Sequence, residues 1–278
     1  MPELPEVETT RLGVSPYLKD AIVTQVIIRQ FSLRWPIAAE LADILTGQTI
    51  FQIQRRAKYL LLHCNSGTLI IHLGMSGRLR IVDIEAGDND LQKHDHVDIT
   101  LDNGHLLRYT DPRRFGAILW TSDPIEQHPL LVDLGPEPLT EEFTADYLWQ
   151  RSQSRCCSIK TLIMNGKVVV GVGNIYANEA LFLAELHPKS AAKNLTFKDH
   201  VALVAAIKNV LNKAISAGGT TLKDFRKSDG KPGYFAQELN VYGRAGSPCP
   251  RCESIIQHYK ETQRATFYCP LCQPTISD

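Results

Sequence analysis

The sequence lacks several features that define simpler protein classes. None of its 278 residues lies in a run of about 18 apolar residues, which argues against a transmembrane helix. Residues 1–6 (MPELPE) are acidic and proline-rich and lack the apolar region of a signal peptide. We therefore expect a cytoplasmic protein with reduced thiols. Its seven cysteines, an odd number, argue against a pure disulfide scaffold.

The sequence also lacks a net charge, because 30 basic residues balance 30 acidic ones. The charges are nevertheless sorted along the chain. Residues 50–80 hold five basic residues and residues 151–178 hold four, with no acidic residue in either, whereas residues 121–147 hold seven acidic residues and no basic one. This sorting suggests a basic face that can bind a polyanion. The alternative is chance clustering of solvated charges.

The first 120 residues predict an early helix at about residues 6–18 and then strands. Short apolar or alternating segments separated by turn signals are typical of a β-sandwich or barrel. The predicted strands are residues 22–28, 50–54, 59–63, 68–72, 79–82, 97–101, 105–109 and 116–120.

After the LGPEP linker at residues 134–138 the pattern becomes helical. Thr196, with Asp199 after it, is a candidate N-cap, and Gly218-Gly219 is a stop signal. Residues 227–246 are rich in Gly and Pro and predict a long loop before a separate cysteine-bearing unit. The predicted helices are residues 140–150, 158–164, 176–184, 196–217 and 221–225.

Two C-x₂-C pairs are the strongest local motif. Cys249 and Cys252 are followed, after 16 intervening residues, by Cys269 and Cys272. Four thiolates at this spacing suit tetrahedral Zn²⁺, and a site closed by four protein ligands is structural. The alternative, reactive pairs or disulfides, fits a cytosolic chain poorly. The other cysteines lack such spacing and are predicted to be ordinary residues: Cys64, Cys156 and Cys157.

The N-terminus is a candidate nucleophile. Removal of Met1 would leave Pro2 with a secondary amine, and an α-amino pKa of about 8 leaves a useful neutral fraction at neutral pH. A neutral amine can attack a sugar carbon to form a Schiff base, and the adjacent Glu3 carboxyl could transfer protons. The alternative is a processed terminus without a catalytic role.

Other segments carry groups suited to nucleic acid. Met75 lies between glycines on a predicted turn, from which an apolar tip can wedge into a base stack. Arg113 and Phe115 offer a cation and an aromatic ring. The GVGN turn at residues 171–174, with its Asn amide exposed, could hold a phosphate at a helix start, and Arg264 could reach a phosphate or base. The alternatives are a core Met or Phe and a solvated arginine.

Together these motifs closely resemble the bacterial formamidopyrimidine-DNA glycosylases. The resemblance runs from Pro2 to about Gln273. It rests on the PELPEVE start, RRAKY at 55–59, HLGMSG at 72–77, GVGNIY at 171–176 and the four cysteines. The endonuclease VIII branch shares the architecture but usually has Gly where this chain has Leu4, which favours the purine-directed branch.

The resemblance implies an α+β multidomain fold with DNA held between its parts. We expect an N-terminal two-sheet β-sandwich catalytic domain at residues 1–134 and a helix–two-turns–helix DNA-binding domain at 135–226. A lid loop and linker would follow at 227–241, and a C-terminal zinc ribbon with four cysteine ligands at 242–278. Residues of about 220–234 match the family's lid over the flipped base.

The resemblance also implies a base-excision-repair enzyme, a bifunctional DNA glycosylase (hydrolase) and abasic-site lyase. It would flip oxidised purines such as 8-oxoguanine and formamidopyrimidines out of duplex DNA, attack C1′ with Pro2, and cut the strand by β,δ-elimination. We expect one structural Zn²⁺, damaged double-stranded DNA as partner, no membrane, no nucleotide cofactor and a monomer in the bacterial cytosol.

By the same resemblance, specific residues take roles. Lys58 matches a lysine of proton transfer and phosphate contact, and Arg264 an arginine that binds phosphates and aids strand cleavage. Met75, Arg113 and Phe115 match the trio that fills the gap left by the flipped base. The implied catalytic residues are Pro2, Glu3, Lys58 and Arg264. The implied DNA contacts are His94, Arg113, Arg155, Asn174, Met75 and Phe115, and the implied metal ligands are Cys249, Cys252, Cys269 and Cys272.

Two alternatives remain open at this point. One is an endonuclease VIII-like glycosylase acting on oxidised pyrimidines, and the other is a non-catalytic protein that binds damaged DNA. The chain also departs from the family at Cys156 and Cys157, where relatives often carry lysines, which would weaken backbone contact beside Arg155.

Overall fold

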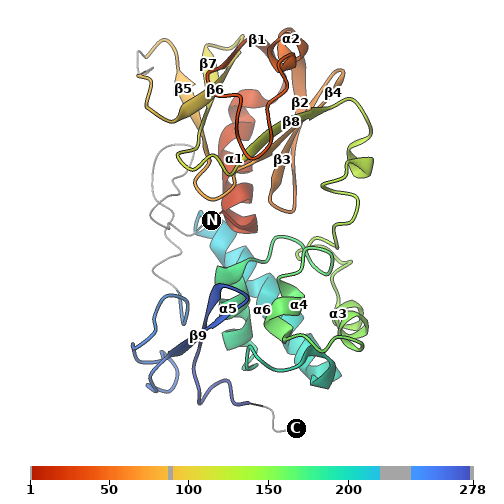
Figure 1. Cartoon of the computed structure of the whole chain (residues 1–278), viewed down its shortest axis with the longest axis vertical. Coiled ribbons are helices and arrows are strands. Elements are labelled where there is room, and N and C mark those ends of the chain that lie inside the picture. Colours follow the sequence, from red (N-terminus) through yellow and green to blue (C-terminus); the bar gives the residue numbers. More distant parts are fainter. Residues whose placement is uncertain (1, 87–89, 220–238, 276–278) are drawn as a thin grey trace. The chain divides into compact units, whose positions relative to one another are not determined.

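The computed structural model of the chain describes residues 2–86, 90–219 and 239–275 (Figure 1). Within this part of the chain, no helix is long and apolar enough to cross a membrane. The chain forms two compact units, which we describe one at a time. Unit 1 is Met1–Val132 with Ala217–Ala236, and unit 2 is Asp133–Ser216 with Gln237–Asp278.

Unit 1 is built from antiparallel strands and a long first helix. Helix α1 (Leu4–Leu18) precedes strands that pair in the order β5-β7-β6-β1-β2-β3-β4-β8. A short helix α2 (Leu41–Leu45) and a 3₁₀ turn η1 (Ile125–Gln127) complete the unit. The strands are β1 (Ala21–Ile28), β2 (Thr49–Arg56), β3 (Tyr59–Cys64), β4 (Gly67–His72), β5 (Arg78–Asp83), β6 (Asp95–Leu101), β7 (His105–Thr110) and β8 (Ala117–Thr121).

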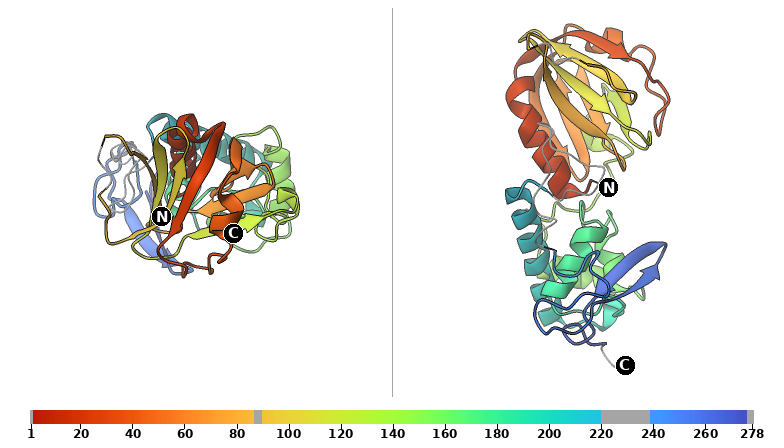
Figure 2. Two further views of the ribbon diagram at one scale, coloured as in Figure 1. Left: turned by 90° about the horizontal axis from the view of Figure 1, so that it is seen from above. Right: turned by 90° about the vertical axis from the view of Figure 1, so that its left-hand side faces the viewer.

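Strand β1 belongs to two sheets, which makes the unit a two-sheet sandwich. Its first two residues pair with β2, whereas from Val23 onward it pairs with β6. The register shifts between Val23 and Gln25, an irregularity of the kind that bends a strand. Both sheets and α1 contribute to one apolar core that includes Val14, Leu60 and Ile99. Figure 2 shows α1 running alongside the strands, and the predicted β-sandwich is confirmed.

Several arginines of the basic segment at residues 50–80 are paired inside unit 1. Arg55 Nε lies 3.0 Å from Glu8 Oε2, and an Arg80 guanidinium nitrogen lies 3.7 Å from Asp95 Oδ2. Part of the positive charge expected on a basic face is therefore neutralised within the fold.

Unit 2 consists of helices and one hairpin. Thr196 and Asp199 cap α6 as predicted, because the Asp199 carboxylate accepts the Thr196 N–H at 2.8 Å and the Thr196 hydroxyl accepts the Asp199 N–H at 3.3 Å. The helix ends before Gly218, the predicted stop signal, which has a positive φ of 78°. The elements are α3 (Ala145–Ser152), α4 (Ile159–Ile163), α5 (Asn174–Leu183), η2 (Ala192–Asn194), α6 (Phe197–Ser216), β9 (Gln257–Glu261) and β10 (Arg264–Tyr268).

One predicted helix begins later than expected. Residues 140–144 are not helical, and α3 starts only at Ala145. The reason is the Thr144 hydroxyl, which accepts the Tyr147 N–H at 3.1 Å and caps the helix there. The helix predicted at residues 221–225, the predicted lid at about residues 220–234 and most of the loop at 227–246 lie outside the described residues.

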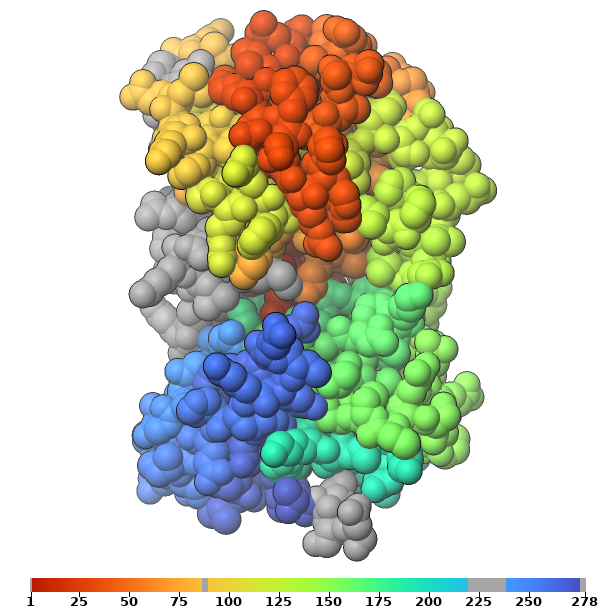
Figure 3. Space-filling view, viewed as in Figure 1, coloured from red at the N-terminus to blue at the C-terminus, as the bar shows by residue number. Residues whose placement is uncertain are grey.

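A buried carboxylate attaches the C-terminal segment to α5. Glu179, 1% exposed, accepts hydrogen bonds at 2.9 Å from the backbone N–H groups of Asn240, Val241 and Tyr242 and from the Asn240 amide. Phe182 and Val241 continue the contact as part of a small core that includes two of the cysteines. Figure 3 shows this segment, in blue, against the green part of the same unit.

We predict that Glu179→Ala destabilises unit 2 by about 3 kcal/mol, because it leaves three backbone N–H groups without their acceptor. Chemical denaturation followed by circular dichroism measures the change. Glu185→Ala is the matched control, because Glu185 forms an exposed ion pair with Arg251 and its loss is expected to cost less than about 1 kcal/mol. Equal losses in the two variants would contradict the prediction.

Candidate active site and metal centre

The first turn of α1 places two carboxylates next to the start of the chain. Pro2 is buried, and Glu3 and Glu6 are each 2% exposed. The Glu6 carboxylate accepts the Glu3 N–H at 2.8 Å, while the Glu3 carboxylate accepts the Glu6 N–H in return. This reciprocal capping box fixes both side chains. Gly219 passes close by, since a Cβ there would lie 3.3 Å from Glu6 Oε1.

Lys58 lies in the tight turn between β2 and β3. The turn requires a positive φ of 54° at Ala57. Strand pairing sets the next residue, Tyr59, opposite His72 of β4, and their rings are 4.9 Å apart. His72 Nδ1 accepts the Gly74 N–H at 3.0 Å, so this ring is tied to the turn that carries Met75.

His72 is a candidate functional residue that the sequence reasoning missed. Burial lowers its pKa to about 4, and the positive charges of Lys58 and Arg34 lower it further, against the opposing charge of Asp111. The imidazole is therefore neutral at pH 7, close to Lys58. The HLGMSG motif begins with this residue, and that position was the available signal.

The structure brings together the three residues expected to fill the gap left by a flipped base. Gly74, with a φ of 63°, packs so closely on the Phe115–Gly116 backbone that a Cβ would lie 2.4 Å from the Gly116 nitrogen. Met75 directly follows this contact in the chain, and Phe115 is 49% exposed. The Arg113 guanidinium carbon lies 5.7 Å from the centre of the Phe115 ring.

The backbone of His94 is hydrogen-bonded to the loop that carries Arg113 and Phe115. Its carbonyl accepts the Asp111 N–H at 3.1 Å. Its ring lies 6.3 Å from that of His96, whose Nε2 is 2.8 Å from the Asp111 carbonyl oxygen.

The hairpin of β9 and β10 carries Arg264 at the start of its second strand. Two helical side chains hold the carbonyl of the next residue, Ala265: Lys160 Nζ at 3.2 Å and Asn174 Nδ2 at 2.9 Å. Lys160 is 2% exposed and also donates to Thr266 Oγ1 at 2.6 Å. The expectation of an exposed Asn174 amide is thus wrong, because its nitrogen docks the hairpin.

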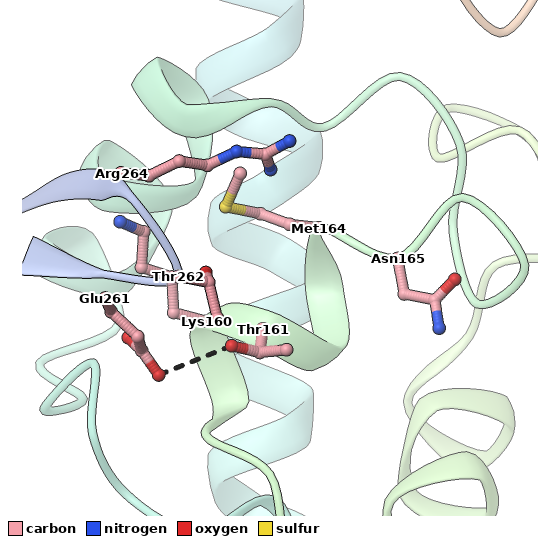
Figure 4. A pocket seen from close by; sticks show the side chains of 7 residues that line it. All are labelled: Lys160, Thr161, Met164, Asn165, Glu261, Thr262 and Arg264. Carbon is pink, nitrogen blue, oxygen red and sulfur yellow. Dashed lines mark hydrogen bonds between the residues drawn. The ribbon is translucent and has the colours of Figure 1, made fainter.

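A cavity of about 340 Å³ lies beside Arg264 (Figure 4). The Thr161 hydroxyl donates to Glu261 Oε1 across 3.3 Å at one side, and Arg264 and Met164 lie at the other. Its lining residues are Lys160, Thr161, Met164, Asn165, Glu261, Thr262 and Arg264. Arg155 is exposed in the turn after α3, followed by an exposed Cys156.

The four predicted metal ligands converge. Their Sγ atoms all lie within 4.8 Å of one another. The sulfur atoms of Cys252 and Cys269 are 3.4 Å apart, and those of Cys249 and Cys272 are 3.9 Å apart. These distances are close to the S–S separation of about 3.8 Å that a tetrahedral zinc with Zn–S bonds of about 2.3 Å requires. The donor set fits one structural Zn²⁺. Burial raises the pKa of the Cys64 thiol to about 11, and Cys64 is not part of the four-cysteine group.

Three family profiles match the chain in sequence order. They are the formamidopyrimidine-DNA glycosylase N-terminal domain over residues 1–118, the formamidopyrimidine-DNA glycosylase H2TH domain over residues 134–226, and the zinc finger found in FPG and IleRS over residues 246–275. The chain belongs to the formamidopyrimidine-DNA glycosylase family. The resemblance inferred from the motifs is confirmed.

Individual relatives agree with the family profiles. The formamidopyrimidine-DNA glycosylase of Hydrogenovibrio crunogenus is 55% identical over 276 residues, which cover 99% of this chain and 98% of that protein. Two structures of Lactococcus lactis Fpg are 32% identical, with TM-scores of 0.89, and cover 99% of this chain and 100% of theirs. One is a mutant bound to DNA containing Fapy-dG, and the other is the wild type bound to DNA containing an oxidised pyrimidine.

Membership makes the chain a DNA-repair enzyme. It is a DNA glycosylase with abasic-site lyase activity that acts on damaged DNA, and its four-cysteine group is a structural zinc site. The family's expected site residues fall into two groups. Unit 1 carries Pro2, Glu3, Lys58, Met75, His94, Arg113 and Phe115, and unit 2 carries Arg155, Asn174, Arg264 and the cysteines.

We predict that His72 makes the stability of unit 1 depend on pH. Its folded pKa of about 4 lies below the ordinary 6.5, so the unfolded state binds more protons between these values. The contribution of neutral His72 to the free energy of unfolding is complete above pH 6.5 and is lost as the pH falls toward 4. The loss amounts to up to about 3 kcal/mol.

Denaturation at a series of pH values measures this dependence. His72→Asn keeps an acceptor for the Gly74 N–H but does not titrate, so its stability should change less than that of the wild type between pH 6.5 and 4. The exposed His258→Asn serves as control and should retain the wild-type dependence. A dependence unaltered in His72→Asn would show the assignment to be wrong.

Proposed function

We propose that this chain removes oxidised purines, 8-oxoguanine and formamidopyrimidines, from duplex DNA through a Schiff base on Pro2. The observation that carries the proposal is the capping box that buries two carboxylates, Glu3 and Glu6, in the residues that directly follow Pro2. Removal of Met1 turns that nitrogen into a secondary amine. A nucleophile next to a fixed acid is the arrangement that covalent glycosylase chemistry needs.

The chemistry follows from that arrangement. The Pro2 nitrogen attacks C1′, the N-glycosidic bond breaks, and the departing base takes a proton for which Glu3 is the donor we propose. The sugar ring then opens as the C1′–O4′ bond breaks, and the proton released by the Pro2 nitrogen passes to O4′. The resulting iminium makes the C2′ hydrogen acidic. Loss of that proton expels the 3′ phosphate, and a second elimination expels the 5′ phosphate, which leaves a gap with phosphates at both ends.

The base must leave the helix before this attack, because C1′ and the base are unreachable within the stacked duplex. Unstacking costs a few kcal/mol, roughly, and side chains inserted through the minor groove can offset it. We assign this role to Met75, Arg113 and Phe115, since Arg113 lies over the exposed Phe115 ring and the Gly74 backbone next to Met75 packs on the Phe115–Gly116 backbone.

We propose that further basic and polar side chains bind the DNA phosphates. Lys58, with neutral His72 beside it, would bind and exchange protons near the reacting nucleotide, and Arg264 would bind the flanking phosphates and aid strand cleavage. We further propose DNA contacts from His94, Arg155 and Asn174.

We also propose that the protein is a monomer in the bacterial cytosol and needs no nucleotide cofactor. We place the domain boundaries at residues 134, 226 and 241.

A second substrate class has one specific observation in its favour. A Lactococcus lactis relative was solved with DNA that contains an oxidised pyrimidine. Oxidised pyrimidines are therefore the second candidate substrate for this chain, and the test below distinguishes the two.

The test is borohydride trapping of the Met-processed protein. With a duplex that carries 8-oxoguanine opposite cytosine, we expect a covalent protein–DNA adduct, because borohydride reduces the Schiff base. Pro2→Gly should trap less, since it replaces the secondary amine. Gel mobility measures the adduct, and intact mass confirms that Met1 is absent.

Each other outcome has a defined meaning. Trapping with thymine-glycol DNA but not with 8-oxoguanine DNA would favour the pyrimidine alternative. No adduct with any lesion or with an abasic site would contradict the Schiff-base mechanism.

A further inference from the structure

Asp111 is a completely buried carboxylate in the loop between β7 and β8, with 0% exposure. Its Oδ1 accepts the Ser76 hydroxyl at 2.7 Å. Its Oδ2 accepts the Gly116 N–H at 2.9 Å and the Tyr109 hydroxyl at 3.1 Å. Burial of a carboxylate is costly unless hydrogen bonds compensate it, and here three donors do so.

These bonds join the two loops that carry the gap-filling residues. Ser76 follows Met75 in one loop, and its hydroxyl oxygen accepts the backbone N–H of Arg113 in the other at 3.1 Å. Gly116 follows Phe115. Met75 and Phe115 are therefore each next to a residue that donates a hydrogen bond to Asp111. Arg113 is hydrogen-bonded to one of those residues, Ser76.

The glycines show how closely the loops are fitted around this carboxylate. A Cβ on Gly116 would lie 1.8 Å from the Tyr109 hydroxyl, and one on Gly74 would lie 2.4 Å from the Phe115 carbonyl carbon. Burial raises the pKa of Tyr109 well above its ordinary value, and the charge and hydrogen bond of Asp111 add to this, so its hydroxyl stays protonated as a donor.

We propose that Asp111 is a positioning residue for base extrusion, which acts through Ser76 and Gly116 to hold Met75, Arg113 and Phe115 in one arrangement. The proposal rests on the proposed function of those three residues. Insertion into a base stack requires side chains fixed before contact, because a displacement of about 1 Å can cost up to about a hundredfold in rate. A buried carboxylate that bonds both loops supplies that rigidity.

The test separates extrusion from the later chemistry. Ser76→Ala removes the link between Asp111 and the Arg113 N–H. Tyr109→Phe is the matched control, because it also removes one hydrogen bond to Asp111, but that bond comes from strand β7 and does not link the two loops. For each we compare two single-turnover rates: base release from an 8-oxoguanine duplex, and incision of an abasic duplex that has no base to extrude.

We expect Ser76→Ala to lower the ratio of base release to abasic incision about tenfold or more, and Tyr109→Phe to change it by less than about twofold. Thermal midpoints should fall in both variants. A merely structural role would lower both rates together and leave the ratio unchanged in Ser76→Ala, and that result would overturn the proposal.

Phe115→Ala distinguishes this failure from failure of the proposed function. If Phe115→Ala lowers the ratio and Ser76→Ala does not, only the positioning role of Asp111 is wrong. If the wild type releases 8-oxoguanine but Phe115→Ala leaves the ratio unchanged, the gap-filling assignment is wrong and the role of Asp111 falls with it.

Discussion

The reciprocal hydrogen bonds between Glu3 and Glu6 are the constraint on which the account depends. We propose Pro2 as the nucleophile, and the residues that follow it fix the backbone next to it. Helix α1 begins at Leu4, and the capping box fixes the backbone of Glu3 at 2.8 Å from a Glu6 oxygen. Both carboxylates are buried in the process. In the mechanism that we propose, one local motif thus places the Pro2 amine and supplies its acid.

Buried polar groups also hold segments together elsewhere in both units. Asp111 draws together the turn of Met75 and the loop of Phe115 in unit 1. In unit 2, Lys160 and Glu179 attach the C-terminal segment to the helices. Buried charges with complete hydrogen bonding rigidify their surroundings, and the loss of either partner is costly.

Local patterns predicted most of the elements. The eight strands of unit 1, the Thr196 cap of α6 and the four-cysteine cluster match the sequence expectations, because each depends on residues close together in the chain. Helix α3 was predicted too early, since a polar segment with helical composition gave no sign that Thr144 would cap it.

The long-range contacts were beyond prediction. Lys160 was interpreted as part of a basic face, yet it is buried against a residue 106 positions away. Asn174 donates across 91 positions to the hairpin. Nor does any local pattern show that Asp111 joins two loops 35 residues apart. Such pairings depend on the folded topology, which sets distant segments next to each other.

The most direct measurement maps the adduct itself. The borohydride-reduced complex would be digested with trypsin and its modified peptide sequenced by mass spectrometry. The account predicts that the sugar remnant is on the nitrogen of Pro2, in the peptide that ends at Arg11. A remnant on the side chain of Lys58 or of another lysine would contradict it, because the amine placed by the capping box would then not be the nucleophile.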